Sequence, residues 1–386
     1  MDYLLTEEQM MMRDLSRKIA EEKIRPVAAE LDEKSEFPYE IMKTLADSDL
    51  FGVYLPEEFG GFGGGVFELC LVTEELSKAC GGISVCYAAS ALGTYPILLF
   101  GNDEQKKKFL PDLASGKKLA AFAVTEPGAG SDASAISTTA KKDGDHYILN
   151  GTKHFITNGE VADVYVIIAM TNKAKGARGA SAFIVEKGTK GFSFGKKEDK
   201  LGIRASTTSE LIFNECRVPA ENLLSREGMG FIITMKTFDV SRPGVAAQAL
   251  GIAQGALDLT VNYACERKQF GKFIAGFQGI QFMLADMTTQ IEAARALIYS
   301  TARMIDAGKT NTSRPSAMSK MYASDVAMKV TVDCIQIYGG YGYMKDYPIE
   351  KYMRDAKITQ IYEGTNQIQR NIIASSLIKE SRKKRS

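Results

Sequence analysis

HYILNGTKHFITNG, residues 146–159, decides the fold class, because apolar and polar residues alternate along it and Gly151 and Gly159 punctuate it. A period of two is typical of a β-strand with one buried face, and Asn-Gly pairs are turn signals. Similar short apolar runs lie on both sides without intervening helical patterns: AAFAV (120–124), VYVIIAM (164–170), SAFIVE (181–186) and SELIF (209–213). Short strands at this spacing predict an antiparallel sheet or barrel rather than a parallel sheet.

Outside this region the apolar period is helical. Thr6 precedes Glu7 and Glu8, which is the pattern of an N-cap followed by acids in the first helical turn. Further helical patterns occupy residues 38–49, 66–79, 83–100, 103–115, 231–268, 277–308, 314–338 and 366–380. We therefore expect an α+β fold, mainly α, with three parts. These are an N-terminal helical domain (1–118), a middle antiparallel β-domain (119–226) and a C-terminal helical bundle (227–386).

Composition excludes several classes of protein. The 386 residues are 45% hydrophobic and 25% charged with a net charge of +1, so no global field favours nucleic acid or an anionic membrane. The stretch 79–102 carries no charge, but its glycines and Pro96 fit a buried, bent helix better than a membrane span. The N-terminus lacks a basic segment followed by an apolar run, so we expect no signal peptide.

Cysteine and histidine usage narrows the chemistry. None of the six cysteines forms a C-x-x-C pair, which suits a reducing compartment. His146 and His154 are the only histidines, so we predict no metal site and no Ser-His-Asp triad. Proton chemistry must then fall to carboxylates, tyrosines or lysines.

The segment IYEGTNQIQR (361–370) places Glu363 between an aromatic residue and a glycine, where a helical pattern restarts. A carboxylate on such a turn can face a pocket and remove a proton from carbon. The alternative for a single glutamate is a solvated surface residue. Glu363 is therefore a hypothesis that depends on the other segments.

Four further features are compatible with a cofactor or ligand site. The loop in FAVTEPGAGSD (122–132) exposes backbone N–H groups to a flavin or a phosphate, or it is a plain strand-loop connection. Phe155 and Thr157 share a strand face, which suits a flat heterocycle or ordinary packing. Asp239 and Arg242 lie three residues apart on one helical face, and Arg267 could bind a diphosphate or form a surface ion pair.

Taken together, six ordered motifs resemble the acyl-CoA dehydrogenase family over nearly the whole chain. They are TEPGAGSD, KHFITNG, SRPGVAA, ERKQFGK, QIYGGYGY and MRDAKITQIYEGTNQIQR. The resemblance implies an FAD enzyme that converts an acyl-CoA to the trans-2-enoyl-CoA, with Glu363 taking the α-proton and flavin N5 the β-hydride. It also implies electron transfer to electron-transferring flavoprotein and a homotetramer built as a dimer of dimers. No nucleic acid partner and no membrane insertion are expected.

By this resemblance, flavin contacts come from the β-domain and from the C-terminal bundle. The β-domain residues expected at the flavin ring are Phe122, Val124, Thr125, Gly130, Ser131, Phe155, Ile156 and Thr157. The expected contacts to the diphosphate side, partly from a second subunit, are Arg267, Gln269, Phe270, Gln278, Gln336, Gly339 and Gly340. Thr365 and Gln367 would close the site after the base. The residues expected to hold the acyl-CoA are Ser131, Asp239, Arg242, Tyr362 and Gly364. Many members of the family carry Trp where Phe155 stands, and this chain has no Trp.

Substrate size is the open point. The pocket floor is expected from residues 83–100, where Ala88, Ala89 and Ala91 leave room while Tyr87 or Leu92 could fill it. We expect a short-chain or small branched or cyclic acyl group in a bacterial cytoplasmic enzyme. The alternatives are a medium-chain acyl-CoA dehydrogenase, an acyl-CoA oxidase of the same fold and a non-catalytic binding scaffold.

Overall fold

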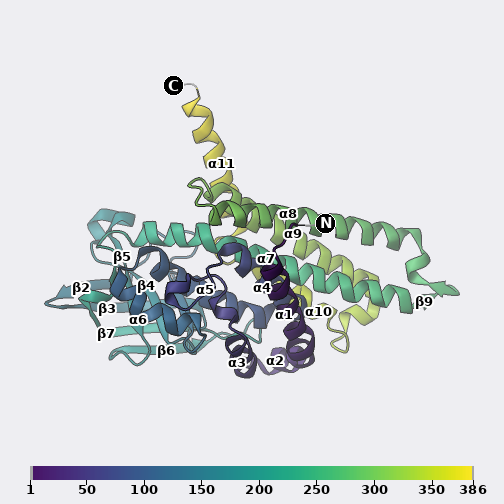
Figure 1. The fold of residues 1–386 in the computed structure, drawn as a ribbon, viewed down its shortest axis with the longest axis horizontal. Coiled ribbons are helices and arrows are strands. Elements are labelled where there is room, and N and C mark those ends of the chain that lie inside the picture. The colour runs from purple at the N-terminus through teal and green to yellow at the C-terminus, as the bar shows by residue number, and fades with distance from the viewer. Residues whose placement is uncertain (1–2, 385–386) are drawn as a thin grey trace.

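Helices form both ends of the chain and a sheet lies between them in sequence (Figure 1). The computed structural model describes residues 3–384. The helices before the sheet are α1 (Glu7–Ile19), α2 (Ala28–Lys34), α3 (Tyr39–Asp47), α4 (Val66–Ala79), α5 (Gly81–Phe100) and α6 (Asp103–Ala114). The helices after it are α7 (Gly230–Glu266), α8 (Gln278–Asp306), α9 (Ser313–Tyr338), α10 (Ile349–Thr359) and α11 (Asn366–Lys383). The predicted mainly helical α+β class is confirmed.

The first helix begins at the predicted N-cap. The Thr6 side chain accepts a hydrogen bond from the Gln9 backbone N–H, and the Gln9 side chain accepts one from the Thr6 N–H. This capping box satisfies two of the donors that a helix start leaves free. The helix then passes through a π-helical turn (Ala20–Ile24) and a 3-10 turn (Arg25–Val27) that contains Pro26. Proline has no N–H to continue an α-helix, so α2 starts anew.

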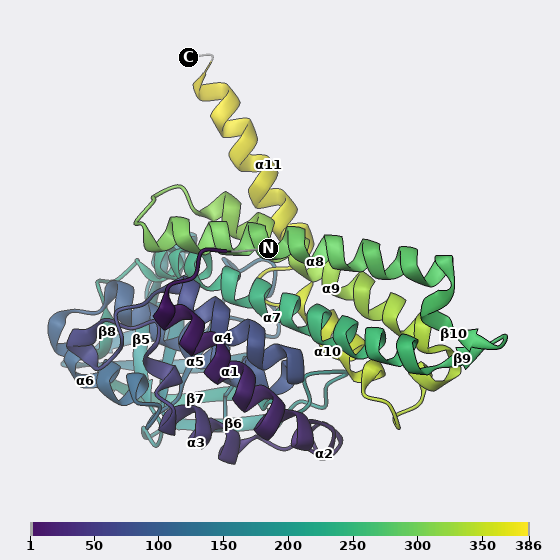
Figure 2. The same ribbon diagram turned by 45° about the vertical axis from the view of Figure 1, so that its right-hand side comes forward.

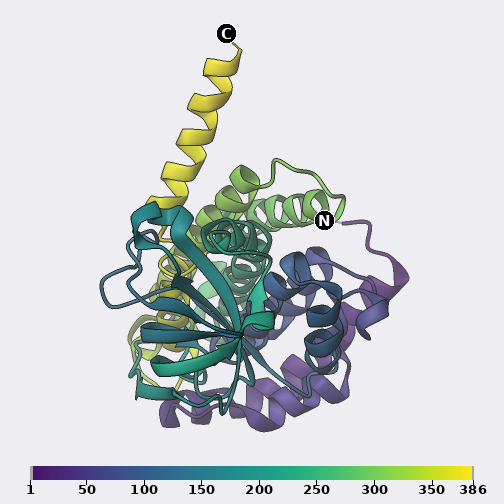
Figure 3. The same cartoon turned by 90° about the vertical axis from the view of Figure 1, so that its left-hand side faces the viewer.

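The sheet is mostly antiparallel, as the alternating pattern predicts. Its strands are β1 (Ala120–Ala123), β2 (Thr139–Asp143), β3 (His146–Thr157), β4 (Val164–Met170), β5 (Ala180–Glu186), β6 (Phe192–Lys197), β7 (Thr208–Pro219) and β8 (Leu223–Leu224). Their order is β6-β7-β3-β2-β4-β5-β8, with β1 beside β4. β1 runs parallel to β4, because the β2–β3 hairpin intervenes and returns the chain in the same direction. Figure 3 shows the strands fanning out beside the N-terminal helices.

Helix α5 is the charge-free stretch, and it is a core helix. It is long and apolar enough to cross a membrane by composition, but 72% of its most apolar window is buried inside the fold. Gly93 lets it touch β1 directly, since a Cβ there would lie 2.6 Å from the Ala121 nitrogen. The chain breaks at Cys80, between α4 and α5, and Pro96 is accommodated within a continuous α5.

Two helices give the molecule its outline. α7 has 37 residues, which corresponds to about 55 Å at 1.5 Å per residue. It runs from the sheet to the far end of the bundle alongside α8 and α9 (Figures 1 and 2). α11 projects away from the rest of the molecule in all three ribbon views. Its side chains Leu377 and Ile378 are 52% and 53% exposed.

Candidate active site

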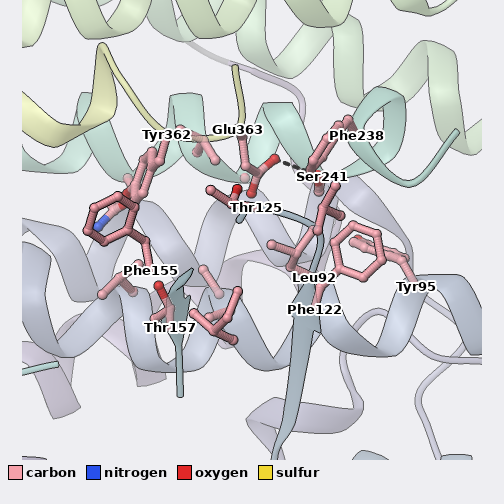
Figure 4. A pocket seen from close by; sticks show the side chains of 18 of the residues that line it. Leu92, Tyr95, Phe122, Thr125, Phe155, Thr157, Phe238, Ser241, Tyr362 and Glu363 are labelled. Carbon is pink, nitrogen blue, oxygen red and sulfur yellow. Dashed lines mark hydrogen bonds between the residues drawn. The ribbon is translucent and has the colours of Figure 1, made fainter. Parts of the chain in front are cut away.

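A cavity lies where α5, α7, the ends of β1 and β3, and the loop between α10 and α11 meet (Figure 4). Its lining residues are Leu69, Val85, Ala88, Ala89, Leu92, Tyr95, Phe122, Val124, Thr125, Phe155, Ile156, Thr157, Phe238, Ser241, Gly244, Val245, Gln248, Tyr362 and Glu363. The lining is apolar apart from a few hydroxyl groups, one amide and one carboxylate. Such a lining suits a ligand that is apolar over most of its surface.

Glu363 is the only carboxylate in this lining, and a left-handed turn points it inward. The backbone has φ of +50° at Glu363 and +91° at Gly364. Glycine is needed at the second position, since a Cβ there would also lie 2.7 Å from the Gln369 side-chain nitrogen. The Ser241 hydroxyl donates a 2.6 Å hydrogen bond to Glu363 Oε2. The carboxylate is thereby fixed in the cavity wall.

Three buried side chains hold the backbone of this turn. Gln369 donates to the carbonyl oxygens of Glu363 and Gly364, at 3.1 and 2.9 Å. Arg242 Nε donates to the Glu363 carbonyl at 3.4 Å, and Lys320 Nζ donates to the Gly364 carbonyl at 2.8 Å. A positive φ costs free energy at a non-glycine residue and persists only where the surroundings fix it. These contacts supply that constraint.

The electrostatic environment makes Glu363 a stronger base than an ordinary glutamate. Burial raises its pKa. The hydrogen bond from Ser241 and the charges of Arg242 and Lys320 oppose this rise but do not cancel it. A carboxylate with a raised pKa has a greater affinity for a proton when it is ionised.

The end of β3 forms the opposite wall. Phe155 is 58% exposed and has φ of +59°, at a β-bulge between Lys153 and Ile156. The bulge breaks strict alternation, so Phe155, Ile156 and Thr157 all line the cavity. Thr125 adds a hydroxyl from the end of β1 (Figure 4). An exposed aromatic ring with nearby hydroxyls fits the flat ring of a flavin.

An ion pair beneath this wall ties β1 to β3. Lys153 Nζ lies 2.7 Å from Glu126 Oε1 and also donates to the Val124 carbonyl at 3.0 Å. The other Glu126 oxygen accepts hydrogen bonds from the backbone N–H and the hydroxyl of Ser137. The pair therefore fixes the residues on either side of the cavity wall relative to each other.

His154 points away from this pair, toward two carboxylates. Its Nε2 lies 3.5 Å from Glu198 Oε1 and its Nδ1 lies 3.1 Å from Glu210 Oε1. Within residues 3–384, these three side chains form the one group whose potential metal ligands cluster. Nδ1 forms a hydrogen bond with Glu210 Oε1, whereas the longer contact leaves Oε1 of Glu198 without a hydrogen bond.

Four of the seven predicted diphosphate-side residues line a second hollow. It lies near β9 (Lys268–Gln269), which Figures 1 and 2 place at the far end of the bundle. The predicted residues that line it are Arg267, Gln269, Gly339 and Gly340. The Arg267 guanidinium lies over the Tyr341 ring at 5.2 Å. Phe270 is 93% exposed, and Gln278 and Gln336 are exposed as well. A single chain does not bring this group to Glu363.

The other predicted residues are divided. Tyr362 lines the cavity and its hydroxyl donates to Gln248. Asp239 and Arg242 are buried on one face of α7, with a 3.5 Å contact between their side chains. The remaining members lie outside the cavity lining: Gly130 and Ser131 are exposed in the loop after β1, Thr365 caps α11 and Gln367 is exposed on it.

Sequence reasoning missed several residues of the site, above all Ser241, Gln248 and Lys320. Ser241 precedes Arg242 in a quoted motif, but no pattern connects it to a residue 122 positions later. Lys320 does carry a signal, because it lies at helical spacing from the buried residues Ala317 and Ser324. A lysine on the inward face of an amphipathic helix indicates a buried partner.

Comparison with known proteins agrees with this fold. Three family models match the chain: acyl-CoA dehydrogenase, N-terminal domain (residues 6–117), middle domain (121–216) and C-terminal domain (228–378). The short-chain specific acyl-CoA dehydrogenase of Clostridium acetobutylicum is 50% identical over 380 residues, which is 98% of this chain and 100% of that protein.

Solved structures show the same likeness. Butyryl-CoA dehydrogenase from Megasphaera elsdenii has a TM-score of 0.96 and 48% identity, over 98% of this chain and 100% of that one. A chain in the structure described as "Electron transferring flavoprotein of Acidaminococcus fermentans" has a TM-score of 0.96 and 52% identity, over 98% and 99% of the two chains. Acyl-CoA dehydrogenase from Bacillus anthracis, complexed with FAD, has a TM-score of 0.92 and 34% identity, over 98% of this chain and 69% of that one.

Helices before and after a sheet in the chain, with a carboxylate in a mainly apolar cavity whose other wall fits a flat ring, are typical of a flavin-dependent dehydrogenase. The chain belongs to the acyl-CoA dehydrogenase family. It is an oxidoreductase that acts on acyl-CoA, and its cofactor is FAD.

Proposed function

We propose that the protein oxidises a short-chain, or small branched or cyclic, acyl-CoA to the trans-2-enoyl-CoA, with Glu363 removing the α-proton. One observation carries this assignment. Glu363 enters a mainly apolar cavity opposite Phe155 and Thr157 and is held there by Ser241 (Figure 4). A thioester placed between these walls would present its α-carbon to the carboxylate.

Removal of the α-proton faces two obstacles, which are the low acidity of the C–H bond and the negative charge that develops on the thioester carbonyl. The α C–H of a thioester is a very weak acid, and burial raises the pKa of Glu363, which narrows the gap between acid and base. We assign the backbone N–H of Glu363 to the thioester carbonyl, where negative charge develops. FAD, when bound along Phe155, Thr157 and Thr125, supplies the hydride acceptor for the β-carbon.

The cavity wall beyond Glu363 supports a short acyl chain. Leu92 and Tyr95 of α5 and Phe122 of β1 face Phe238 there (Figure 4). Ala88 and Ala89 also line the cavity, while Tyr87 turns away and donates to the Leu50 carbonyl. Rates of flavin reduction measured across acyl-CoAs of increasing length should fall beyond the short chains. Fastest reduction by longer chains would favour the medium-chain alternative.

The separation of the two hollows supports a shared cofactor site. We propose that Arg267, Gln269 and the segment Gln336–Gly340 contact FAD held mainly by another subunit of a homotetramer. We also propose electron-transferring flavoprotein as the electron acceptor, because a chain 52% identical to this one belongs to a structure described by that protein's name. We further propose a bacterial cytoplasmic location. Rapid reoxidation of the reduced enzyme by air would instead favour the oxidase.

Replacement of the base tests the central assignment. E363Q should bind FAD and acyl-CoA as the wild type does, because Gln keeps the shape and polarity of the side chain, but substrate should no longer bleach the flavin. E380Q is the matched control, since Glu380 lies exposed on α11 and pairs with Arg314. Stopped-flow absorbance measures both variants. Bleaching of E363Q at the wild-type rate would assign the base elsewhere.

A further inference from the structure

Lys320 is a fully buried cation behind the catalytic turn. It lies on α9 and is 0% exposed. Neighbours on the same helical face are small, including Ser316, Ala317 and Ala323. A lysine is rarely buried unless it is paired, because removing its charge from water is costly. Its contacts therefore identify what it does.

Lys320 contacts both Gly364, which follows Glu363, and Asn366, the first residue of α11. Its Nζ donates to the Gly364 carbonyl at 2.8 Å and to Asn366 Oδ1 at 3.0 Å. The Asn366 amide nitrogen in turn donates to Ser324 Oγ at 2.9 Å and Asp325 Oδ1 at 2.8 Å. The turn that aims Glu363 is thus anchored to α9 through one ammonium group.

The charged groups around this ammonium come from three elements. Glu363 faces it from the turn, Arg242 and Asp239 belong to α7, and Asp325 belongs to α9. Burial lowers the pKa of Lys320 to about 7, while the charge of Glu363 opposes the fall. Asp239 is already in contact with Arg242, and Asp325 accepts from Asn366, Gln360 and Arg370. Lys320 and Arg242 are the cations that act on Glu363.

We propose that Lys320 is a positioning residue for Glu363: its ammonium fixes the carbonyl of Gly364 and the side chain of Asn366, and its charge favours the ionised carboxylate that a base requires. This inference rests on the proposed role of Glu363. It adds a residue on a different element, remote in sequence, that sets both the aim and the ionisation of the base.

Infrared titration of the protein tests the charge effect without turnover. The carboxyl band of Glu363 is identified as the one that E363Q lacks. In K320M its titration midpoint should rise by about one pH unit, because an opposite charge has been removed. The pH at which substrate bleaches the flavin at half its maximal rate should move the same way. K329M is the control: Lys329 is on the same helix, about 13 Å along its axis, and is paired with Asp333 at the surface.

Hydrogen exchange separates positioning from charge. K320M should speed amide exchange in residues 363–369, whereas K320Q, which is neutral but still a donor, should raise the midpoint with a smaller effect on exchange. K320Q also carries the test if K320M does not fold. An unchanged midpoint in K320Q, or a shift of equal size in K329M, would overturn the proposal. Bleaching of E363Q would refute the proposed function instead, and it leaves the infrared result interpretable.

Discussion

Lys153 and Glu126 form an ion pair with almost no exposure, at 0% and 2% of their side chains. Burial alone would raise the pKa of Glu126. The Lys153 charge and hydrogen bonds from Thr138 and Ser137 outweigh burial and lower it to about 2. Glu126 directly follows Thr125, and Lys153 lies two residues before Phe155. The position of the cavity wall therefore depends on this ion pair.

Loss of one partner should be costlier than loss of both. K153M leaves a buried carboxylate without its cation, which should lower the free energy of unfolding by about 3–5 kcal/mol. K153M/E126Q removes both charges and should recover much of this. Urea denaturation measures the difference, with K142M on the exposed face of β2 as the control. A double variant as unstable as K153M would show that charge imbalance is not the cause.

The same carboxylate predicts a dependence on pH. Its pKa of about 2 in the folded protein lies below the ordinary value of 4.5. Ionised Glu126 therefore stabilises the fold above pH 4.5, and this contribution is lost as the pH falls toward 2. The stability difference between wild type and E126Q should shrink over that range in urea titrations. A constant difference would contradict the assignment.

At the scale of elements, two glycines bring α7 against α4. A Cβ at Gly251 would lie 2.2 Å from the Glu74 carbonyl oxygen, and one at Gly255 would lie 2.1 Å from that of Lys78. Both obstacles are backbone, so they cannot rotate aside. G251A and G255A should each destabilise the protein by about 1–3 kcal/mol or more in thermal or urea unfolding. G279A on α8, where a Cβ meets open space, should be neutral or stabilising.

Sequence periodicity predicted most elements, and the exceptions have a physical cause. The pattern at 66–79 matches α4 (Val66–Ala79), because the helix is buried along most of its length. α10 was not predicted. Its inward face carries Lys351 and Asp355, 6% and 1% exposed, which pair at 2.5 Å. Two paired charges can occupy an inward helix face in place of apolar side chains. A search for apolar residues at helical spacing does not detect such a face.

At the scale of the molecule, the proposed homotetramer would give the projecting α11 a partner surface. We expect L377D/I378D to reduce the oligomeric state measured by light scattering, because charges on an exposed apolar face oppose burial against another subunit. M11D on α1 is the control, since Met11 is 72% exposed at the other end of the sequence. Unchanged mass in L377D/I378D would remove this helix from the interface.

Residue patterns alone did not predict how the site is distributed over the molecule; the family resemblance supplied the expectation of contacts from a second subunit. Glu363 and Phe155 were predicted and line one cavity. Arg267 was predicted for the same cofactor, yet it lies at a second hollow. Residue patterns report local conformation, and they contain no direct information on which chain completes a site.

The continuous 37-residue helix α7 has a consequence for how the protein tolerates insertions and deletions. Ser241, in the first third of α7, hydrogen-bonds to the Glu363 carboxylate, while Arg267 follows the C-terminal end of the helix. One inserted residue between them would turn one end relative to the other by about 100°. Homologous chains should therefore gain and lose residues in the surface connections, while the segment from Ser241 to Arg267 keeps a constant length.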